Sequence, residues 1–517
     1  MILIRVSCIC LCCDIKNAQF KPYLLPKKHN ITSHSQKVKR WMNARGDYDI
    51  NTKKHQVRLI DKLSKTQLFQ LIYMNQSAKR YSPLQAAMIG GAIATTATIS
   101  VFSQAWTRSV HAALQDSPKA LVDQVWQVVN REYVDEKFNQ QDWQAIRQSL
   151  LSKDYTSKDD AYVAIREALQ RLGDPYTRFM NPQQYESLTN QTSGEVSGIG
   201  ITMEINENTK RLTVIEAIEN SPALKGGLKS GDQILAIDGK STLKMSVEDA
   251  SKLIRGQVGT PVSLDLERPG NKFNIKLTRA TIEVPTVRYT LKQEGGRKVG
   301  YIRLQEFSSH AADQMRTAIR KLDNKKVDSY VLDLRGNPGG LLNASIEIAR
   351  MWLDDGHIVK TVDRKGSSSN TKANRTAITN LPLAILVDGN SASASEILTG
   401  ALKDNKRAVV VGSQTFGKAL VQSVHELADG SGLAVTIAHY YTPNGTDINH
   451  KGITPDIKLD LTQTQERQLA SNPKLIGTDS DPQYARAIAA LSNGKVAEKV
   501  TNENSQSISV RAEDLKF

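Results

Sequence analysis

Cysteine is almost absent from this chain of 517 residues. Its four cysteines, Cys8, Cys10, Cys12 and Cys13, all lie near the N-terminus. Disulfide bonds and a thiol nucleophile are therefore excluded from everything after residue 13, which suits an exported protein that depends on neither. The C-x-C-x-C-C spacing has no second cluster and no nearby histidine pair, so it does not predict a zinc site.

A strong charge excess is absent from the globular part. The formal net charge of the whole chain is +15. Residues 1–105 contain 16 Lys and Arg against 4 Asp and Glu, or +12, and the remaining 412 residues contain 52 against 49, or +3. A groove that follows phosphates needs a basic excess in the folded domains. We therefore expect no nucleic-acid partner.

Long apolar runs are also scarce. The uncharged stretch 84–102 is just long enough to span a bilayer, but it is rich in Ala, Gly and Thr. Lys79 and Arg80 precede it and small residues follow at Ser103 and Ala105, which is the pattern of a secretory signal. An uncleaved membrane anchor is the nearest alternative, and a buried helix is a third.

The late position of this stretch is unusual. If translation began at Met74, a normal n-region would precede the apolar run. Residues 1–73 are then an upstream extension, either a start assigned too early or an additional targeting segment. We treat residues 1–105 as a basic extension with a signal peptide or membrane anchor.

Periodicity divides the rest of the chain. Residues 106–185 place apolar residues at i, i+3 and i+4 and predict a helical segment. Residues 186–284 change to period two, in short runs separated by Gly and Asp-Gly turns. Residues 285–462 begin with a basic linker at 292–298 and then alternate strands and helices, which predicts an α/β core with a largely parallel sheet. Residues 463–517 predict a helix and a polar tail.

Two loops of this core carry candidate chemistry, and each follows a predicted strand. Three serines lie where the strand 381–387 gives way to a helix: Ser391, Ser393 and Ser395. Lys418 follows among apolar residues. A serine hydroxyl becomes a nucleophile when a base takes its proton, and a lysine can be this base when burial lowers its pKa. The pattern indicates a Ser–Lys hydrolase, with the choice among the three serines open.

Plainer interpretations of these loops stay open as well. Ser391 or Ser393 could be a helix N-cap, with Glu396 completing a capping box. The glycine-rich run 336–340 could be an ordinary turn, or it could donate a backbone N–H to an oxyanion hole. It lacks the Lys-Ser/Thr ending of a phosphate-binding loop.

Signatures of other hydrolases are missing. No Gly-x-Ser-x-Gly elbow and no His-Glu-x-x-His occurs, and the histidines of the core are scattered without ligand spacing. The Ser-x-x-Lys of penicillin-binding enzymes places its lysine one helical turn away, whereas Lys418 follows Ser393 by 25 residues. We expect neither a metal nor a cofactor.

Residues 186–284 resemble a PDZ domain. The run Gly-Asp-x-Ile-Leu-x-Ile-Asp-Gly, residues 231–239, supports the resemblance together with a Gly-Ile-Gly-Ile sequence. Glycines there let backbone N–H groups converge on the terminal carboxylate of a peptide, which adds as a strand to the sheet edge. The carboxylate-binding loop corresponds to Gly198, Ile199, Gly200 and Ile201.

Residues 117–490 resemble the carboxyl-terminal processing peptidases, also called tail-specific proteases, and are most similar to cyanobacterial and plastid members. Five motifs carry the resemblance in order: Leu-Gly-Asp-Pro-Tyr-Thr-Arg-Phe (172–179), Asp-Leu-Arg-Gly-Asn-Pro-Gly-Gly-Leu (333–341), Ser-Ala-Ser-Ala-Ser-Glu-Ile (391–397), Arg-Ala-Val-Val-Val-Gly-x-x-Thr-Phe-Gly-Lys (407–418) and Asp-Ile-Asn-x-x-Gly-Ile-x-Pro-Asp (447–456). The resemblance implies a multidomain α/β fold: a ClpP/crotonase-like protease core, an inserted PDZ domain and an N-terminal helical segment.

The resemblance also assigns roles, residue by residue. It implies that Ser393 is the nucleophile, Lys418 the general base and Gln422 a residue that orients the lysine. Ala419 departs from the family, which more often has glycine at that place. Further residues receive supporting roles: Ala394 and one of the two glycines Gly339 and Gly340 in the oxyanion hole, Glu396 and Asp404 as assisting residues, and Arg255 in coupling the PDZ domain to the protease.

The implied activity is that of a serine endopeptidase without metal or cofactor. Protein substrates would dock their exposed, apolar C-termini on the PDZ groove and be cut through an acyl-enzyme, in the periplasm or the thylakoid lumen. The photosystem II reaction-centre precursor is one candidate substrate. The alternatives are a catalytically silent PDZ scaffold and an acyl-CoA enzyme on a related fold. Loss of peptide cleavage in Ser393→Ala would argue against the scaffold, and acyl-CoA turnover would identify the other enzyme.

Overall fold

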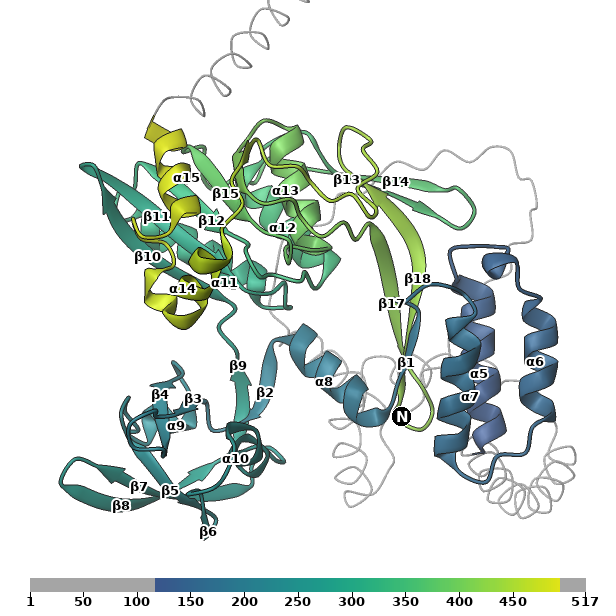
Figure 1. Cartoon of the computed structure of the whole chain (residues 1–517), viewed down its shortest axis with the longest axis horizontal. Helices are drawn as coiled ribbons and strands as arrows, with labels where there is room; N and C mark the ends of the chain where they lie inside the picture. The colour runs from purple at the N-terminus through teal and green to yellow at the C-terminus, as the bar shows by residue number, and fades with distance from the viewer. Residues whose placement is uncertain (1–116, 493–517) are drawn as a thin grey trace, which may run out of the picture. The chain divides into compact units, whose positions relative to one another are not determined.

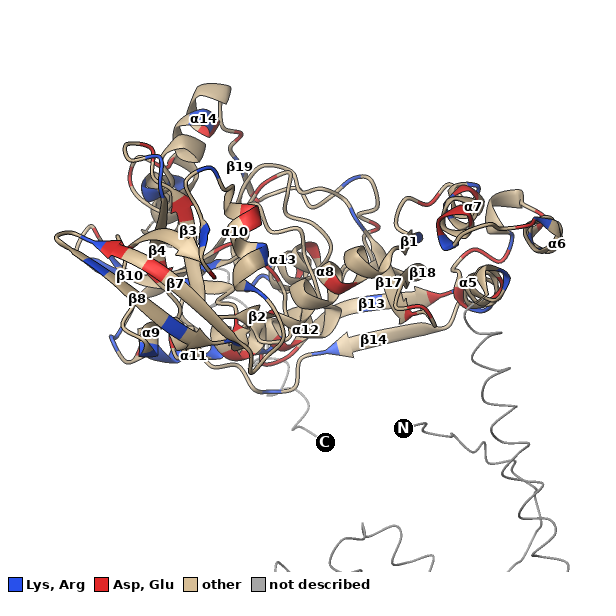
Figure 2. Ribbon diagram, turned by 90° about the horizontal axis from the view of Figure 1, so that it is seen from below, with Lys and Arg blue, Asp and Glu red and all other residues tan. Residues whose placement is uncertain are grey.

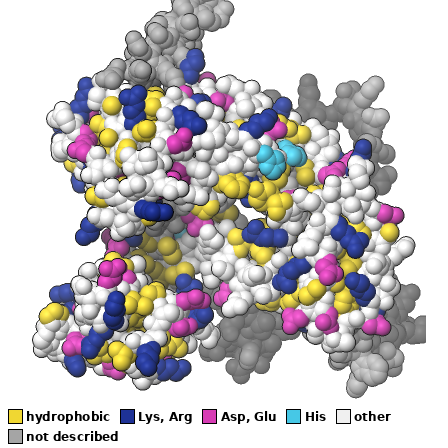
Figure 3. All heavy atoms as spheres, in the orientation of Figure 1, with side chains coloured by type: hydrophobic (Ala, Val, Ile, Leu, Met, Phe, Trp, Pro, Cys, Tyr) yellow, Lys and Arg dark blue, Asp and Glu magenta, His cyan; other side chains and the backbone are white. Residues whose placement is uncertain are grey.

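The computed structural model describes residues 117–492, which all belong to the second of two units, 1–105 and 106–517. The four cysteines and the signal-like stretch 84–102 lie outside the described residues. Within 117–492, no helix is both long and apolar enough to cross a membrane. Lys and Arg are interspersed with Asp and Glu along the described ribbon (Figure 2) and on the face that Figure 3 shows.

A six-stranded sheet forms the predicted α/β core (Figure 1). Its order is β10 (Val287–Glu294), β11 (Arg297–Leu304), β12 (Ser329–Asp333), β15 (Leu383–Val387), β16 (Val409–Gly412) and β19 (Ile457–Lys458). All neighbours from β11 to β19 pair in parallel, and β10 is antiparallel to β11. The largely parallel sheet that the strand–helix alternation predicted is confirmed.

Helices cover both faces of this sheet because its central strands are apolar on both sides. Leu332 and Ile385 face a core that includes three helices, α11 (Ala311–Asp323), α12 (Leu342–Trp352) and α13 (Ala394–Asp404). Val331 and Leu386 face the other way, against α15 (Pro482–Ser492). A short helix, α14 (Gln463–Ser471), precedes α15. The result is a three-layered core.

The predicted basic linker at 292–298 is wrong. Residues 287–304 form the antiparallel hairpin of β10 and β11, with a tight turn at Gly295 and Gly296. Both glycines have positive φ, 56° and 81°, which a two-residue hairpin turn requires. Lys292 belongs to β10, at the edge of the sheet, and Arg297 and Lys298 precede the part of β11 that pairs with β12, which begins at Val299. Charged residues are compatible with strand segments that pair on one side only.

A second, antiparallel sheet was not anticipated from the sequence. It orders β1 (Arg178–Met180), β18 (Gly432–Tyr441), β13 (His357–Asp363) and β14 (Ser368–Lys372), with β17 (Leu420–Glu426) also paired to β18. One face of β18 packs on the helical segment, which consists of α5 (Pro118–Glu132), α6 (Trp143–Ser152) and α7 (Lys158–Gln170). Leu433 and Val435 of β18 share a core with Val125 and Ile165 of these helices. The predicted helical segment is confirmed for these three helices.

The PDZ-like region contains its own sheet and core. The sheet order is β3 (Ile201–Ile205), β4 (Leu212–Ala217), β5 (Gln233–Ile237), β7 (Pro261–Arg268) and β8 (Asn271–Thr278), with β6 (Lys240–Ser241) paired to β5. Its helices are α9 (Pro222–Lys225) and α10 (Val247–Ile254). Helix α8 (Pro182–Ser193) and the pair β2 (Glu195–Gly198) and β9 (Ala280–Glu283) join this region to its neighbours in sequence.

A buried ionic network attaches the C-terminal segment to the core. The Arg335 guanidinium donates to Asp333 at 2.6 Å and to Asp481 at 2.7 and 2.9 Å. Both carboxylates are 0% exposed. Because Arg335 belongs to the loop that follows β12 and Asp481 immediately precedes α15, the network fixes this loop against the C-terminal helix.

We predict that Asp481→Asn destabilises the core by about 3 kcal/mol, because removal of one charge leaves a buried guanidinium incompletely compensated. Thermal denaturation measures the effect as a lowered melting temperature. The control is Asp460→Asn, which removes a carboxylate paired with Lys458 at 3.4 Å where both side chains are 60% exposed. Exposed pairs contribute little, so the control should melt like the parent. Equal melting temperatures for all three proteins would contradict the assigned role of the network.

Candidate active site

The three serines of the turn between β15 and α13 differ in their surroundings. Ser391 and Ser395 are 0% exposed, and their hydroxyls donate to the carbonyls of Leu334 and Asn337, each at 2.9 Å. The Ser393 side chain is half-buried and lines a cavity. Two of the hydroxyls therefore hold the turn to the neighbouring loop, and the third is available to a ligand in the cavity.

The backbone of Ser393 is strained. Its φ of 55° and ψ of −113° place it in a region that side-chain-bearing residues rarely adopt. Gly339, with φ of 106°, approaches it so closely that a Cβ there would lie 2.9 Å from the Ser393 Cβ. Position 339 requires glycine for two reasons: a residue with a side chain would be strained at this φ, and its Cβ would lie too close to Ser393. The strain presents the hydroxyl at the start of α13.

One cavity of about 230 Å³ brings most of the predicted catalytic residues together. It is lined by Ser393, Lys418, Gln422, Ala394 and Gly340. Apolar side chains such as Leu341, Leu342 and Ile397 form much of the remaining wall. The sequence separated these residues by up to 82 positions, and the pairing of β12 with β15 and of β17 with β18 places them around one space.

Burial lowers the pKa of Lys418, and the positive charge of Arg178 lowers it further. The carboxylates of Asp174 and Glu396 act in the opposite direction. The ammonium nitrogen also lies 4.6 Å from the centre of the Tyr176 ring. Because the net shift is downward, a larger share of the side chain is the neutral amine that can accept a proton.

Glu396 connects the two catalytic segments. One of its carboxylate oxygens accepts from the backbone N–H groups of Ser393 and Lys418, each at 2.9 Å. The other accepts from the Gly417 N–H at 2.7 Å and the Thr415 hydroxyl at 2.6 Å. The side chain is 0% exposed, and this burial raises the pKa of the carboxyl while the four hydrogen bonds lower it.

Glu396 makes the contact that the capping-box interpretation predicted, and it makes a further contact besides. It makes the reciprocal contact of a capping box to the Ser393 N–H, and it also reaches the lysine loop, which a cap alone would not do.

Tyr440 of β18 is a site residue that sequence reasoning missed. Its buried hydroxyl contacts the backbone carbonyl of Lys418 and lies 3.1 Å from that of Ser393. It lines the same cavity. No local motif marks a tyrosine near the end of a strand, so its position emerges only when β18 pairs with β17.

The two glycines proposed for the oxyanion hole are not equivalent. The Gly339 N–H donates to the side-chain oxygen of Asn337 at 2.9 Å. Gly340 instead lines the cavity, as does Ala394. Asn337, also missed from the sequence, accepts at its own carbonyl from the Ala392 N–H, so it joins the glycine loop to the serine turn.

The remaining predicted residues lie at different distances from this cavity. Gln422 lines it and contacts the Thr436 hydroxyl at 3.4 Å. Asp404 is at the other end of α13, about 15 Å along the helix from Ala394 at 1.5 Å per residue, and accepts from the Asn444 N–H. Arg255 is exposed at the end of α10. The structure therefore brings Gln422 to the cavity and leaves Asp404 and Arg255 away from it.

The predicted carboxylate-binding loop lies next to an edge of the PDZ-like sheet. Strand β3 is the terminal strand of that sheet, and the loop precedes it. Gly200 has φ of 78°, and its Cβ position would lie 2.3 Å from the Ser221 Cβ, so only glycine fits. The Ile199 carbonyl accepts from the Ala223 N–H at 2.9 Å. Because the two groups of a trans peptide point oppositely, the Gly200 N–H faces away from this partner.

Comparisons with known proteins find one family and one domain that match parts of the chain. The chain matches peptidase family S41 over residues 298–459 and the PDZ domain over residues 213–268. It is 44% identical over 383 residues to a carboxyl-terminal-processing protease of Picosynechococcus sp., covering 74% of this chain and 91% of that protein. A second, of Synechocystis sp., is 42% identical over 385 residues, with coverage of 74% and 88%.

Plant and structural relatives extend the comparison. The chain is 38% identical over 385 residues to carboxyl-terminal-processing peptidase 2, chloroplastic, of Arabidopsis thaliana, covering 71% of this chain and 75% of that protein. Among solved structures, a photosystem II D1 C-terminal processing protease is 36% identical, with a TM-score of 0.46 and coverage of 71% of this chain and 99% of that one.

We predict that Glu396→Gln lowers kcat for peptide cleavage about 100-fold with little change in KM, because small misplacements of reacting groups have effects of this size. A glutamine offers one acceptor oxygen, so two of the four donors lose their partner whichever way the amide turns. Steady-state kinetics of peptide cleavage measures the effect. Glu466→Gln, at an exposed position of α14, is the matched control. A kcat within twofold of the parent would show that Glu396 does not hold the site.

Proposed function

The chain belongs to the carboxyl-terminal-processing proteases of peptidase family S41, and on that premise we propose that it cuts apolar, unstructured C-terminal tails by a Ser–Lys acyl-enzyme mechanism. It is a serine peptidase with a PDZ domain, which disfavours the silent scaffold and the acyl-CoA enzyme. The observation that carries the mechanism is the shared cavity of Ser393 and Lys418, with the lysine pKa lowered by burial.

Proton transfer starts the reaction. The neutral Lys418 amine accepts the proton of the Ser393 hydroxyl as its oxygen attacks the scissile carbonyl carbon. The tetrahedral intermediate then expels the amine of the departing segment, which takes the proton back from the lysine, and an acyl-enzyme remains. The lysine next accepts a proton from water as the water oxygen attacks the ester carbonyl carbon. Collapse of this second tetrahedral intermediate breaks the bond to the Ser393 oxygen, which takes the proton back from the lysine as the new C-terminus is released. Gln422 lines the same cavity, and we assign to it the orientation of the amine.

The negative charge of the tetrahedral intermediate needs fixed donors. We assign the backbone N–H groups of Ala394 and Gly340, which line the cavity, rather than that of Gly339, which donates to Asn337. The N-terminus of α13 adds the favourable end of its dipole at the same place. The apolar lining of the cavity suits an uncharged side chain beside the scissile bond.

Substrate selection takes place at the PDZ domain. The tail adds as a strand beside β3, and its terminal carboxylate is held by the backbone N–H groups of the loop Gly198–Ile201. The edge position of β3 and the orientation of the Gly200 N–H support this assignment. The coupling of the PDZ domain to the protease through Arg255, whose side chain is exposed at the end of α10, stays a proposal.

We also propose that the protein is exported, to the periplasm or the thylakoid lumen. The signal-like stretch 84–102 and the lack of cysteine after residue 13 support export. Relatives with the chloroplastic designation fit this assignment. Attachment to a membrane through residues 84–102 stays a proposal of the same kind.

We predict that Ser393→Ala and Lys418→Ala each reduce peptide cleavage by about 1,000-fold or more, since each removes one half of an activated nucleophile. Binding of a fluorescent tail peptide, followed by anisotropy, should stay at the parent level. Ser368→Ala, in an exposed strand, is the control for the serine change. Persistent cleavage by Ser393→Ala would assign the nucleophile to another group.

The recognition step predicts a dependence on the substrate terminus. Replacing the terminal carboxylate of a tail peptide by an amide should raise KM about tenfold, because a charge-assisted hydrogen bond contributes about 1.5 kcal/mol or more. The kcat should change little, since the terminus is remote from the scissile bond. An acetylated N-terminus on the same peptide serves as control. Equal KM values for acid and amide would refute carboxylate recognition.

A further inference from the structure

A short segment from the N-terminal part of the chain forms one wall of the catalytic cavity. Tyr176 and Arg178 both line it, together with Gly340 of the glycine loop. Asp174 shapes the turn before them, because its carboxylate accepts from the Tyr176 N–H at 2.9 Å and the Thr177 hydroxyl at 2.7 Å. Thr177 in turn accepts from the backbone N–H of Thr436 on β18 at 3.0 Å. The wall is thus fixed to the second sheet.

Strand pairing decides which way Arg178 points. Arg178 pairs with Ala434 of β18, and Ala434 pairs with Val424 of β17, so the three residues form a row across the strands. Residues paired directly share a face of the sheet, and all three line the cavity. The next row, which includes Phe179 and Leu433, faces the helical segment and shares its core.

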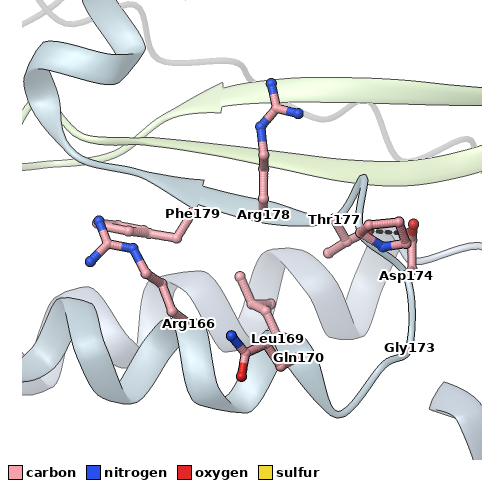
Figure 4. A pocket seen from close by; sticks show the side chains of 9 residues that line it. Arg166, Leu169, Gln170, Gly173, Asp174, Thr177, Arg178 and Phe179 are labelled. Carbon is pink, nitrogen blue, oxygen red and sulfur yellow. Dashed lines mark hydrogen bonds between the residues drawn. The ribbon is translucent and has the colours of Figure 1, made fainter.

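Figure 4 shows this division of faces: the Arg178 side chain projects from β1 away from Arg166 and Leu169 of α7. Arg166 lies over the ring of Phe179, at 5.4 Å, on the opposite side of the strand. Both arginines line the cavity of about 420 Å³ beside α7, but only Arg178 also lines the cavity of Ser393 and Lys418. Within residues 117–492, no ion pair joins Arg178 to a carboxylate.

The charged groups around the catalytic lysine act on its protonation in opposite directions. The Glu396 carboxylate must be present to hold the serine turn and the lysine loop, yet its charge favours the ammonium form of Lys418. Asp174 has the same effect, and the Tyr176 ring also attracts a cation. Burial opposes these groups, and the guanidinium of Arg178 is the charged group that acts with it. A guanidinium keeps its charge throughout the working pH range.

We propose that Arg178 is a positioning residue for proton transfer, whose positive charge on the cavity wall favours the uncharged Lys418 amine, the form that accepts the proton of Ser393. This inference rests on the proposed function, in which Lys418 is the base. It gives the N-terminal segment an electrostatic part in catalysis: the charge reaches the cavity only when β1 is paired with β18.

The test is the pH profile of kcat/KM for a tail peptide with Arg178→Lys, Arg178→Gln and Arg178→Glu. Loss of the charge raises the pKa of Lys418, so the acid limb of the profile must move to higher pH. We expect Arg178→Lys to keep the parent limb, Arg178→Gln to shift it upward by about half a pH unit or more, and Arg178→Glu to shift it further. Well above the limb, the rates should approach that of the parent.

Arg166→Gln is the matched control, since it removes an arginine from the same region without touching the catalytic cavity. Its limb should coincide with that of the parent. Melting temperatures verify that each variant is folded. If Arg178→Glu is unfolded, the limbs of Arg178→Lys and Arg178→Gln still test the inference. The rate of Ser393 modification by a fluorophosphonate, measured against pH, repeats the comparison without a bound peptide.

Three results would overturn the inference. The first is an unchanged limb in Arg178→Gln, and the second is an equal shift in Arg166→Gln. The third is a raised KM at every pH with the limb unmoved, which would assign Arg178 to binding an acidic group of the substrate. Lys418→Ala distinguishes a failure of this inference from a failure of the proposed function. If Lys418→Ala is active, the lysine is not the base and the proposed function is wrong. If Lys418→Ala is inactive and the limb of Arg178→Gln is unmoved, only the role of Arg178 is refuted.

Discussion

The buried carboxylate of Glu396 accepts hydrogen bonds from the segments that carry Ser393 and Lys418, and the geometry of the site depends on it. Taking a carboxylate out of water costs several kcal/mol, and hydrogen bonds to a charged group each return about 1.5–3 kcal/mol at best. The pKa of this carboxyl is still raised, so burial outweighs its four partners. The protein thus retains a carboxylate whose burial is unfavourable, because this carboxylate holds the segments of Ser393 and Lys418 in position.

The charge of Glu396 affects the protonation of Lys418. A carboxylate beside Lys418 favours the charged form of the lysine, whereas the proposed mechanism needs the neutral form. Burial of the lysine and the charge on Arg178 act in the other direction. The active site is therefore assembled from a helix of the parallel core, a loop leading into the antiparallel sheet and a strand from the N-terminal segment. No single domain of the sequence contains all the required charges.

The parallel core was predictable because β11, β12 and β15 have apolar centres and are followed by the helices α11, α12 and α13. The antiparallel sheet was not. Its strand β14 contains no apolar residue, and β1 is three residues long, so neither has a pattern that a period of two would reveal. The hairpin at 292–298 was taken for a linker for a similar reason, since its strand ends are basic. Asp404 was assigned an assisting role only because its position matches the family pattern. It lies at the far end of α13, away from the cavity.

The sequence by itself determined the family resemblance, the succession of helical, PDZ and protease regions, and the chemical types in the motif loops, because these depend on local pattern and spacing. It could not choose among Ser391, Ser393 and Ser395 without that resemblance. Tertiary structure separated them, because packing buries two of the hydroxyls against backbone carbonyls and leaves the third in the cavity. It likewise decided the places of Tyr440, Asn337 and Arg178, since their neighbours are set by pairing between segments far apart in the chain.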